Sequence, residues 1–159
     1  MTATRFLASP VGLLRISADA RGVTAIDRVT KRHKVQHSGD AKARSHAETA
    51  VTQLREYFDG QRRHFDVPLH MHGTEVQQRA WKTMRKIRYG ATMSYAQQAR
   101  AMGSPKAVRA VGSANGANPI PIIVPCHRVV AGDGTLGGYS AGLPMKRKLL
   151  ALEGVSVAE

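Results

Sequence analysis

The sequence predicts an α+β protein in which a small antiparallel sheet with one helix precedes a helical domain that carries the only cysteine. Three observations predict this fold class. Short apolar runs alternate with turn residues over positions 4–29. Apolar residues then recur at helical spacing from position 47, and two helix-start signals follow position 73. The 159 residues, 42% of them hydrophobic, suffice for one domain or two small ones.

The N-terminal part is predicted to form two or three antiparallel strands and a helix. A Ser-Pro-Val-Gly turn at 9–12 separates two apolar runs, and ADARG separates the second run from VTAIDRV. Segment 31–42 is polar and is expected to be a mobile loop. The apolar face of the following helix consists of Ala47, Ala50, Val51, Leu54, Tyr57 and Phe58, and Asp59-Gly60 ends it. Pro68 argues against a long central strand in the next segment, so we expect one domain over 1–73 and a second over 74–159.

The C-terminal part is predicted to contain a helix-turn-helix. A first helix starts at a Thr74–Gln77 capping box, and its apolar face is formed by Val76, Ala80, Trp81, Met84 and Ile87 before Gly90. A second capping box, Ser94–Gln97, precedes an apolar stripe that ends at Gly103. Ser104 and Pro105 suit the start of the next helix. Two short helices joined by a glycine-containing turn are typical of this motif.

The net charge of +13 favours a polyanionic partner, with nucleic acid first. The region between Glu75 and Asp133 has no acidic residue. It contains nine cations, for which phosphate contact is expected and a solvated basic face is the alternative: Arg79, Lys82, Arg85, Lys86, Arg88, Arg100, Lys106, Arg109 and Arg128. The second helix of the motif is slim, with Ala107, Ala110 and Ser113 among its small residues, which favours binding by shape or lesion over base reading. The alternative is that small residues only permit close helix packing.

Cys126 is the candidate nucleophile. Three prolines precede it in NPIPIIVPC, which fixes the path of the chain, and His127 and Arg128 follow as a base and a cation. Neighbouring side chains of an extended strand point to opposite faces, so a direct Cys126–His127 pair requires a turn, and otherwise a water must mediate. Glu153, near the end of the last helix, is a candidate partner for His127.

PCHRVV at 125–130, with NPIPIIV and RAVGSANGAN before it and GTLGGYSAG and KRKLLALEG after it, strongly resembles the O6-alkylguanine-DNA alkyltransferases. The resemblance is dense over about 74–154 and looser before that. It implies an N-terminal ribonuclease H-like sheet domain and a C-terminal winged-helix-like domain that holds the cysteine. Both halves agree with the pattern-based prediction.

The resemblance implies that the helix-turn-helix enters the minor groove of double-stranded DNA and that O6-alkylguanine is flipped out toward Cys126. Arg109 would fill the vacated space and Tyr95 would help to drive the nucleotide out. The remaining residues expected to contact DNA or the base are Ala107, Ala110, Ser113, Pro121, Arg128, Tyr139, Ser140 and Lys146. Of these, Lys146 or Ser140 would join Tyr95 in donating hydrogen bonds to the guanine.

The implied chemistry is one irreversible transfer of the alkyl group to Cys126, without a cofactor. By resemblance, His127 deprotonates Cys126 through water, Glu153 orients His127, and Asn118 organises the loop that carries these groups. Three positions depart from the family pattern, namely Val76 for a phenylalanine, Arg88 for a proline and Ala141 for a glycine. They put the substrate range in question, including O4-alkylthymine, rather than the reaction type.

Other functions remain as alternatives. A non-catalytic protein that recognises alkylated DNA would lack the cysteine, a helix-turn-helix regulator would carry base-reading side chains, and a thiol hydrolase would give the basic region no role. No metal is expected, because the histidines of the first half, among them His70 and His72, lack cysteine partners for a tetrahedral zinc site. No signal segment or membrane span is visible, so a cytoplasmic protein is expected. The protein is also expected to be monomeric in solution, and cooperative binding along DNA is left open.

Overall fold

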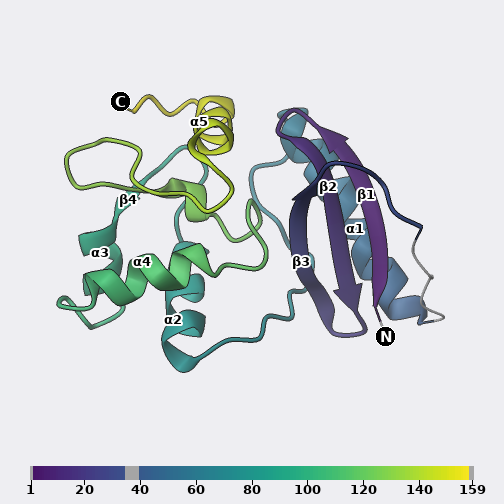
Figure 1. Ribbon diagram of the computed structural model, residues 1–159, viewed down its shortest axis with the longest axis horizontal. Helices are drawn as coiled ribbons and strands as arrows, with labels where there is room; N and C mark the ends of the chain where they lie inside the picture. Colours follow the sequence, from purple (N-terminus) through teal and green to yellow (C-terminus); the bar gives the residue numbers. More distant parts are fainter. Residues whose placement is uncertain (1, 35–39, 158–159) are drawn as a thin grey trace. The chain divides into compact units, whose positions relative to one another are not determined.

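The computed structural model describes residues 2–34 and 40–157. Contacts within the chain divide it into two compact units, Met1–Met71 and His72–Glu159 (Figure 1). Among these described residues, the first unit contains a sheet and one long helix, and the second contains four α-helices, one short 3-10 turn and a two-stranded ladder. The predicted α+β class is confirmed, with the sheet preceding the helical part.

The sheet of the first unit consists of β1 (Ala3–Ser9), β2 (Gly12–Asp19) and β3 (Gly22–Val29), paired antiparallel in the order β1-β2-β3. The predicted turn joins β1 to β2, and the hydroxyl of Ser9 donates to the carbonyl of Gly12 at 2.7 Å. Gly22 lies against the chain at Pro68, where a Cβ atom would come within 2.5 Å of the Pro68 oxygen. Only glycine therefore fits at the start of β3.

Helix α1 (Ala41–Phe58) covers one face of this sheet (Figure 1). It begins inside the segment expected to be a loop, because the Asp40 side chain accepts from the Ala43 amide and caps the helix. Residues 35–39 of that segment lie outside the described residues. Small side chains allow the helix to approach the sheet closely, and they form a buried cluster of Ala3, Ala18, Ala43 and Ala47.

The second unit begins with two helices whose capping boxes are both formed. Helix α2 (Glu75–Met84) starts at Thr74 and Gln77, and α3 (Tyr95–Ala101) starts at Ser94 and Gln97. Helix α4 (Val108–Gly116) follows α3 after a turn, and α5 (Leu143–Leu152) ends the unit. Strands β4 (Met93–Ser94) and β5 (Val129–Val130) pair in parallel, with Met93 opposite Val129 and Ser94 opposite Val130.

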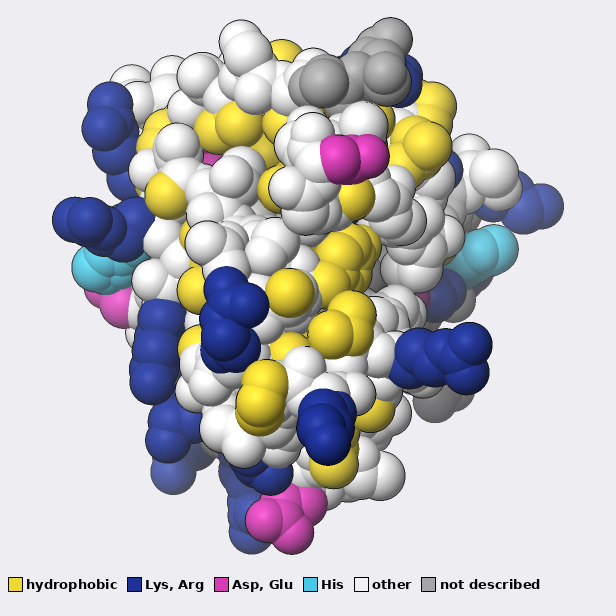
Figure 2. Space-filling model, turned by 90° about the vertical axis from the view of Figure 1, so that its left-hand side faces the viewer, with side chains coloured by type: hydrophobic (Ala, Val, Ile, Leu, Met, Phe, Trp, Pro, Cys, Tyr) yellow, Lys and Arg dark blue, Asp and Glu magenta, His cyan; other side chains and the backbone are white. Residues whose placement is uncertain are grey.

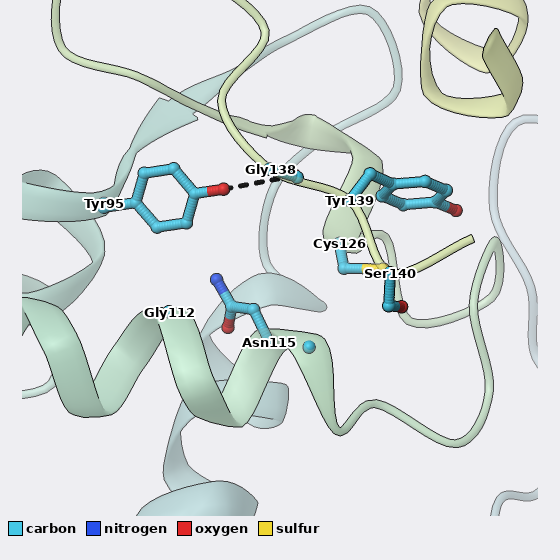
Figure 3. A pocket seen from close by; sticks show the side chains of 8 residues that line it. Tyr95, Gly112, Asn115, Cys126, Gly138, Tyr139 and Ser140 are labelled. Carbon is cyan, nitrogen blue, oxygen red and sulfur yellow. Dashed lines mark hydrogen bonds between the residues drawn. The ribbon is translucent and has the colours of Figure 1, made fainter. Parts of the chain in front are cut away.

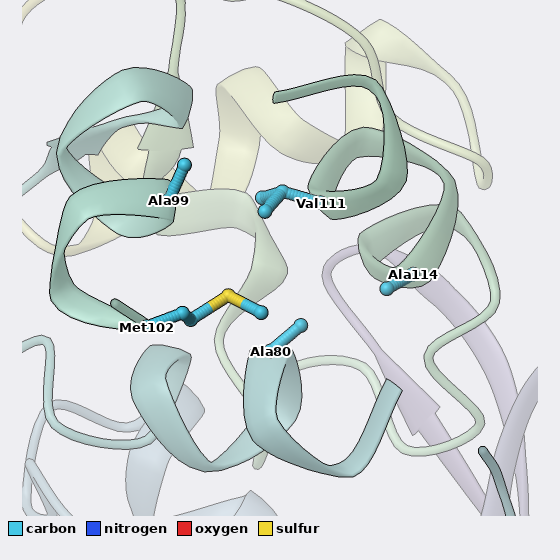
Figure 4. Packing of buried hydrophobic residues seen from close by; sticks show 5 residues of the cluster. All are labelled: Ala80, Ala99, Met102, Val111 and Ala114. Atoms are coloured by element: carbon cyan, nitrogen blue, oxygen red, sulfur yellow. The ribbon is translucent and has the colours of Figure 1, made fainter. Parts of the chain in front are cut away.

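The helix-turn-helix core lies where α2, α3 and α4 meet. Ala80, Ala99, Met102, Val111 and Ala114 form one buried cluster (Figure 4). The indole nitrogen of Trp81 donates to the carbonyl of Ala114 at 2.8 Å, which ties α2 to α4. Because these contact residues are mostly small, α4 lies close to α2 and α3. The opposite face of α4 is exposed to solvent.

Two helix boundaries differ from the sequence prediction. Helix α2 ends at Met84 rather than near Gly90, and Ile87 is buried from the turn that follows, where its amide donates to the Met84 carbonyl. Val76 is 40% exposed, so it belongs to the surface rather than to the predicted apolar face. Helix α4 begins at Val108 rather than at Pro105, because the Ala107 amide closes a turn on the Ser104 carbonyl.

Within residues 2–34 and 40–157, no helix has the length and apolar character needed to cross a bilayer.

Candidate active site

Cys126 begins a short 3-10 turn, η1 (Cys126–Arg128), that follows a tightly bent approach. Ile122 has φ +75°, a strained conformation for a β-branched residue, and it is 1% exposed. The Asn118 side chain fixes this bend from inside, since its Nδ2 donates to the Val124 carbonyl at 2.8 Å and its Oδ1 accepts from the Ile120 amide at 2.9 Å. Asn118 thus ties the two ends of the bend together, and its role in the reaction stays a prediction.

A pocket of about 170 Å³ opens in front of Cys126. Figure 3 shows its walls, which come from α3, α4 and the loop before α5. The lining residues are Tyr95, Gly112, Asn115, Gly116, Cys126, Gly138, Tyr139 and Ser140. A cavity of roughly 150 Å³ binds benzene, so the pocket has room for the ring of an aromatic molecule beside the sulfur.

Burial raises the pKa of the Cys126 thiol above its ordinary value of 9.0. Hydrogen bonds from Asn118 and Tyr139 and the charge of Lys146 act in the opposite direction. The thiol is therefore protonated at neutral pH, and a base is needed to generate the thiolate.

His127 is fully buried, and its Nε2 lies 2.6 Å from Glu153 Oε2. Burial lowers the pKa of His127, while Glu153 raises it and the charges of Arg128 and Lys146 lower it further. The imidazole is accordingly neutral, with Nε2–H donating to Glu153 and Nδ1 carrying the lone pair. Nδ1 is buried, and no described residue forms a hydrogen bond with it.

Glu153 also accepts from the Gly90 amide at 3.4 Å and is held by two hydrogen bonds from Arg128. Arg128 Nε donates to Oε1 at 2.8 Å and Arg128 Nη2 donates to Oε2 at 3.0 Å, which makes a bidentate ion pair with both side chains buried. Arg128 Nη1 donates to the Ile87 carbonyl at 2.7 Å. The expectation that Arg128 contacts DNA is therefore corrected, because its guanidinium is buried and each of its three nitrogens donates to Glu153 or to Ile87.

Lys146 is also buried rather than placed at the pocket wall. Its Nζ donates to the carbonyls of Val129 at 2.6 Å and Gly138 at 2.9 Å. Burial lowers its pKa to about 8, and the neighbouring Cys126 acts against that shift. Lys146 thus links β5 to the loop that carries Tyr139, and the expectation that it donates directly to a base does not match its position.

Three predicted residues line the pocket with Cys126. The hydroxyl of Tyr95 donates to the Gly138 carbonyl at a long 3.3 Å. Burial raises the pKa of Tyr95, so this hydroxyl keeps its proton. Tyr139 lies near the buried Lys146 ammonium, 6.0 Å from Nζ to the ring centre, and Ser140 is exposed.

Other predicted residues lie on the outer side of the helix-turn-helix. Arg109, Ala110 and Ser113 are exposed and share one face of α4 by their spacing. Ala107, half-buried, precedes the helix, and Pro121, also half-buried, lies in the bent approach to Cys126. The structure does not bring these residues into the pocket.

The surface of the second unit is strongly basic. Apart from Arg128, the eight cations between Glu75 and Asp133 are all exposed. On the side that carries α3 and the start of α4, Figure 2 shows Lys and Arg side chains around apolar ones, with few acidic side chains. This mixture suits a polyanion that also offers apolar surface.

Asn115 and Gln98 were missed by sequence reasoning. Asn115 lines the pocket, and the two amides bond to each other between α3 and α4. The available signal was an amide near the end of a helix made of small residues, but its partner lies 17 positions away in sequence. Among the described residues, no group of three or more His, Cys, Asp or Glu side chains is arranged to hold a metal ion.

Residues 75–155 match the DNA-binding domain model of 6-O-methylguanine DNA methyltransferase, and residues 3–71 match its ribonuclease-like domain model. The chain belongs to the 6-O-methylguanine DNA methyltransferase family. Membership assigns the reaction type, which is DNA repair by transfer of an alkyl group from DNA to a protein cysteine.

Individual members of the family are similar over nearly the whole chain. The methylated-DNA–protein-cysteine methyltransferase of Mycolicibacterium paratuberculosis is 42% identical over 94% of this chain and 90% of its own length. The crystal structure of O6-methylguanine methyltransferase from Mycobacterium tuberculosis has a TM-score of 0.82 at 40% identity and covers 100% of this chain and 97% of its own. The M. tuberculosis protein OGT in complex with DNA has a TM-score of 0.83 at 43% identity, over 95% and 92% of the two chains.

Proposed function

We propose that this chain repairs O6-alkylguanine in double-stranded DNA by one irreversible transfer of the alkyl group to Cys126. One observation carries the proposal. The only cysteine in the sequence lines a pocket large enough for an aromatic ring, and the next residue, His127, forms a buried pair with Glu153. Proteins of this family transfer the alkyl group to one of their own cysteines, and Cys126 is the only cysteine in this sequence.

The transfer balances with groups present in the pocket. The thiol proton passes through a water to the Nδ1 lone pair of His127, and the negative charge of Glu153 stabilises the imidazolium that forms. The thiolate attacks the alkyl carbon, so a sulfur–carbon bond forms while the carbon–O6 bond breaks. The bonding pair leaves on the guanine oxygen, a proton from water at ring nitrogen N1 completes normal guanine, and the His127 imidazolium returns its proton to water.

Tyr95 is proposed to assist the leaving group. Its hydroxyl is protonated, and its bond to the Gly138 carbonyl is long, so it can exchange that acceptor for the base. A thioether is a stable product that no described group is placed to cleave, so each molecule acts once.

DNA binding is proposed to use the outer face of α4 in the minor groove. Arg109 is the long exposed side chain on that face, and Ala110 and Ser113 beside it allow close approach. Arg109 would occupy the space that the flipped nucleotide leaves. Action as a monomer and location in the cytoplasm remain predictions.

Intact-protein mass spectrometry after mixing with duplex DNA tests the function. With O6-methylguanine in the duplex, the wild-type chain is expected to gain one methylene per molecule, mapped to Cys126. Cys126→Ser with the same duplex, and the wild type with an unmodified duplex, should show no gain. Tight binding without a mass gain would leave a lesion-recognition protein, and no binding would overturn the proposal.

A further inference from the structure

Gln98 and Asn115 form a closed pair of amide hydrogen bonds between α3 and α4. Gln98 Nε2 donates to Asn115 Oδ1 at 2.9 Å, and Asn115 Nδ2 donates to Gln98 Oε1 at 2.8 Å. Gln98 is 0% exposed and Asn115 is 7% exposed. The Gln98 Nε2 also donates to the Ala80 carbonyl of α2 at 3.2 Å, so the pair joins all three helices.

The Ala80 carbonyl fixes the orientation of both amides. A backbone carbonyl can only accept, so the NH2 group of Gln98 must lie on that side. With Gln98 fixed, turning the Asn115 amide would oppose two NH2 groups and two oxygens, at the cost of buried unsatisfied polar atoms. Asn115 Oδ1 therefore faces Gln98, and one of the two Nδ2 hydrogens is used.

The second Nδ2 hydrogen of Asn115 has no partner among the described residues, and Asn115 lines the pocket. In Figure 3 the amide nitrogen points into the space between α4 and Tyr95. Gly112 and Gly116, the other pocket residues from α4, have no side chains, and a Cβ atom at either would meet nothing within 4 Å. Asn115 thus supplies the only α4 side chain of this wall among the described residues.

We propose that Asn115 is a specificity-determining residue that donates its second Nδ2 hydrogen to an acceptor on the edge of the base in the pocket, with Gln98 as its positioning residue. The inference rests on the proposed function. Its ligand class is a nucleobase with an unprotonated ring nitrogen or a carbonyl oxygen facing α4. Because the amide is already oriented, the contact needs no rearrangement, and a base that presents a hydrogen there would leave two donors opposed.

The best variant removes the whole amide pair. Changing Asn115 alone would leave the Gln98 amide buried without its partner, whereas replacing both partners with apolar residues of similar shape is close to neutral for stability. Gln98→Leu/Asn115→Leu therefore removes the pocket donor while keeping the packing of α3 on α4. Asn115→Ala, which keeps Gln98, serves as a second variant if the double variant does not fold. Thermal unfolding and duplex affinity report any general damage.

The experiment measures single-turnover transfer from duplexes that contain O6-methylguanine or its 1-deaza, 3-deaza or 7-deaza analogue, each with one ring nitrogen replaced by C–H. We expect one analogue to slow transfer by the wild type about five- to tenfold, because one neutral hydrogen bond to the base is lost. The double variant should be slowed to a similar degree on O6-methylguanine and should show no further loss with that analogue.

The outcomes separate the two proposals. If every analogue slows the wild type and the variants by the same factor, Asn115 makes no contact with the base and the assignment is overturned. A purely structural role would lower the unfolding temperature and the transfer rate without dependence on the analogue, which also overturns it. If the wild type transfers nothing from O6-methylguanine, the proposed function fails, and the assignment fails with it.

Discussion

At the scale of single residues, proton transfer from Cys126 to His127 depends on two shifted pKa values. Burial lowers the pKa of His127 below its ordinary 6.5 and raises that of Cys126 above its ordinary 9.0. Between these values the imidazole is neutral and the thiol is protonated. The pair is therefore ready for base-assisted transfer over the whole neutral range.

We expect a level transfer rate from pH 6.5 to about pH 8, where the neighbouring Lys146 loses its charge, with the acid limb below 6.5 because the folded pKa of His127 is lowered. The free energy of unfolding should also fall as pH drops below 6.5, since the unfolded chain binds the His127 proton more readily than the folded chain. Rapid-quench transfer assays, with circular dichroism at each pH to confirm folding, measure both. An acid limb centred above pH 6.5 would contradict the assignment of His127 as the base.

Glu153 serves both stability and chemistry, and two variants separate the roles. Glu153→Gln leaves Arg128 buried without its countercharge, so we expect a loss of about 3–5 kcal/mol in unfolding free energy. Adding Arg128→Met should restore part of that stability, because the guanidinium that lost its countercharge is removed. Transfer should stay slow in both variants, since His127 lacks its carboxylate in each. Urea unfolding and single-turnover rates test this, and full recovery of transfer in the double variant would contradict an orienting role.

The sequence predicts local features well and distant partners poorly. The capping pairs Thr74–Gln77 and Ser94–Gln97 were predicted correctly, because each forms within four residues. Arg128 was expected to contact DNA because it is one of the nine cations in the region without acidic residues. Its carboxylate partner is 25 positions away, and nothing local shows that the two side chains are buried together.

At the scale of elements, the loop before α5 depends on two neighbouring glycines with different environments. Gly137 has φ +70°, and a Cβ there would lie 3.0 Å from Tyr95 Cε2 and 3.1 Å from its hydroxyl. Gly138 meets nothing within 4 Å and has no left-handed φ. The first glycine is thus required by Tyr95, and the second is not required by sterics.

Gly137→Ala should lower the unfolding free energy by about 1–2 kcal/mol through its left-handed backbone and should slow transfer by displacing Tyr95. Gly138→Ala is the matched control for stability, and it should change the free energy of unfolding by less than about 0.5 kcal/mol. Thermal unfolding and single-turnover assays on both variants provide the comparison. Equal effects of the two substitutions would show that the loop does not hold Tyr95 in the way described.

Element boundaries were predicted less well than the elements themselves. The apolar spacing that continues to Ile87 favours a longer α2, but a turn after Met84 buries the same side chain. Pro105 suits a first helical position, yet it lies in a turn that delays α4 to Val108. In both places a turn and a helix satisfy the same local pattern, and tertiary packing selects between them.

At the scale of the whole molecule, the net charge of +13 should make DNA affinity strongly dependent on salt. Arg100 and Lys106 are exposed around the turn of the helix-turn-helix. Replacing either with Gln should weaken binding at all sequences alike and reduce the slope of log affinity against log salt by about 1. Arg15→Gln is the control, because Arg15 already pairs with Asp27 at 3.2 Å. Fluorescence anisotropy over a salt series measures the slopes, and equal changes for all three would contradict a local DNA contact.

The short ladder between β4 and β5 holds together the segments that carry Tyr95 and Cys126. Ser94 caps the helix that starts at Tyr95, while Val129 directly follows the turn that starts at Cys126, and backbone pairing joins the two segments. The distance between the segment that leads to Tyr95 and the segment that follows Cys126 is therefore set by main-chain atoms that every amino acid except proline supplies. Mutations at Asn115, Tyr139 or Ser140 can reshape the interior for other alkyl groups while this frame stays intact. The substrate range can thus drift in evolution without first breaking the chemistry.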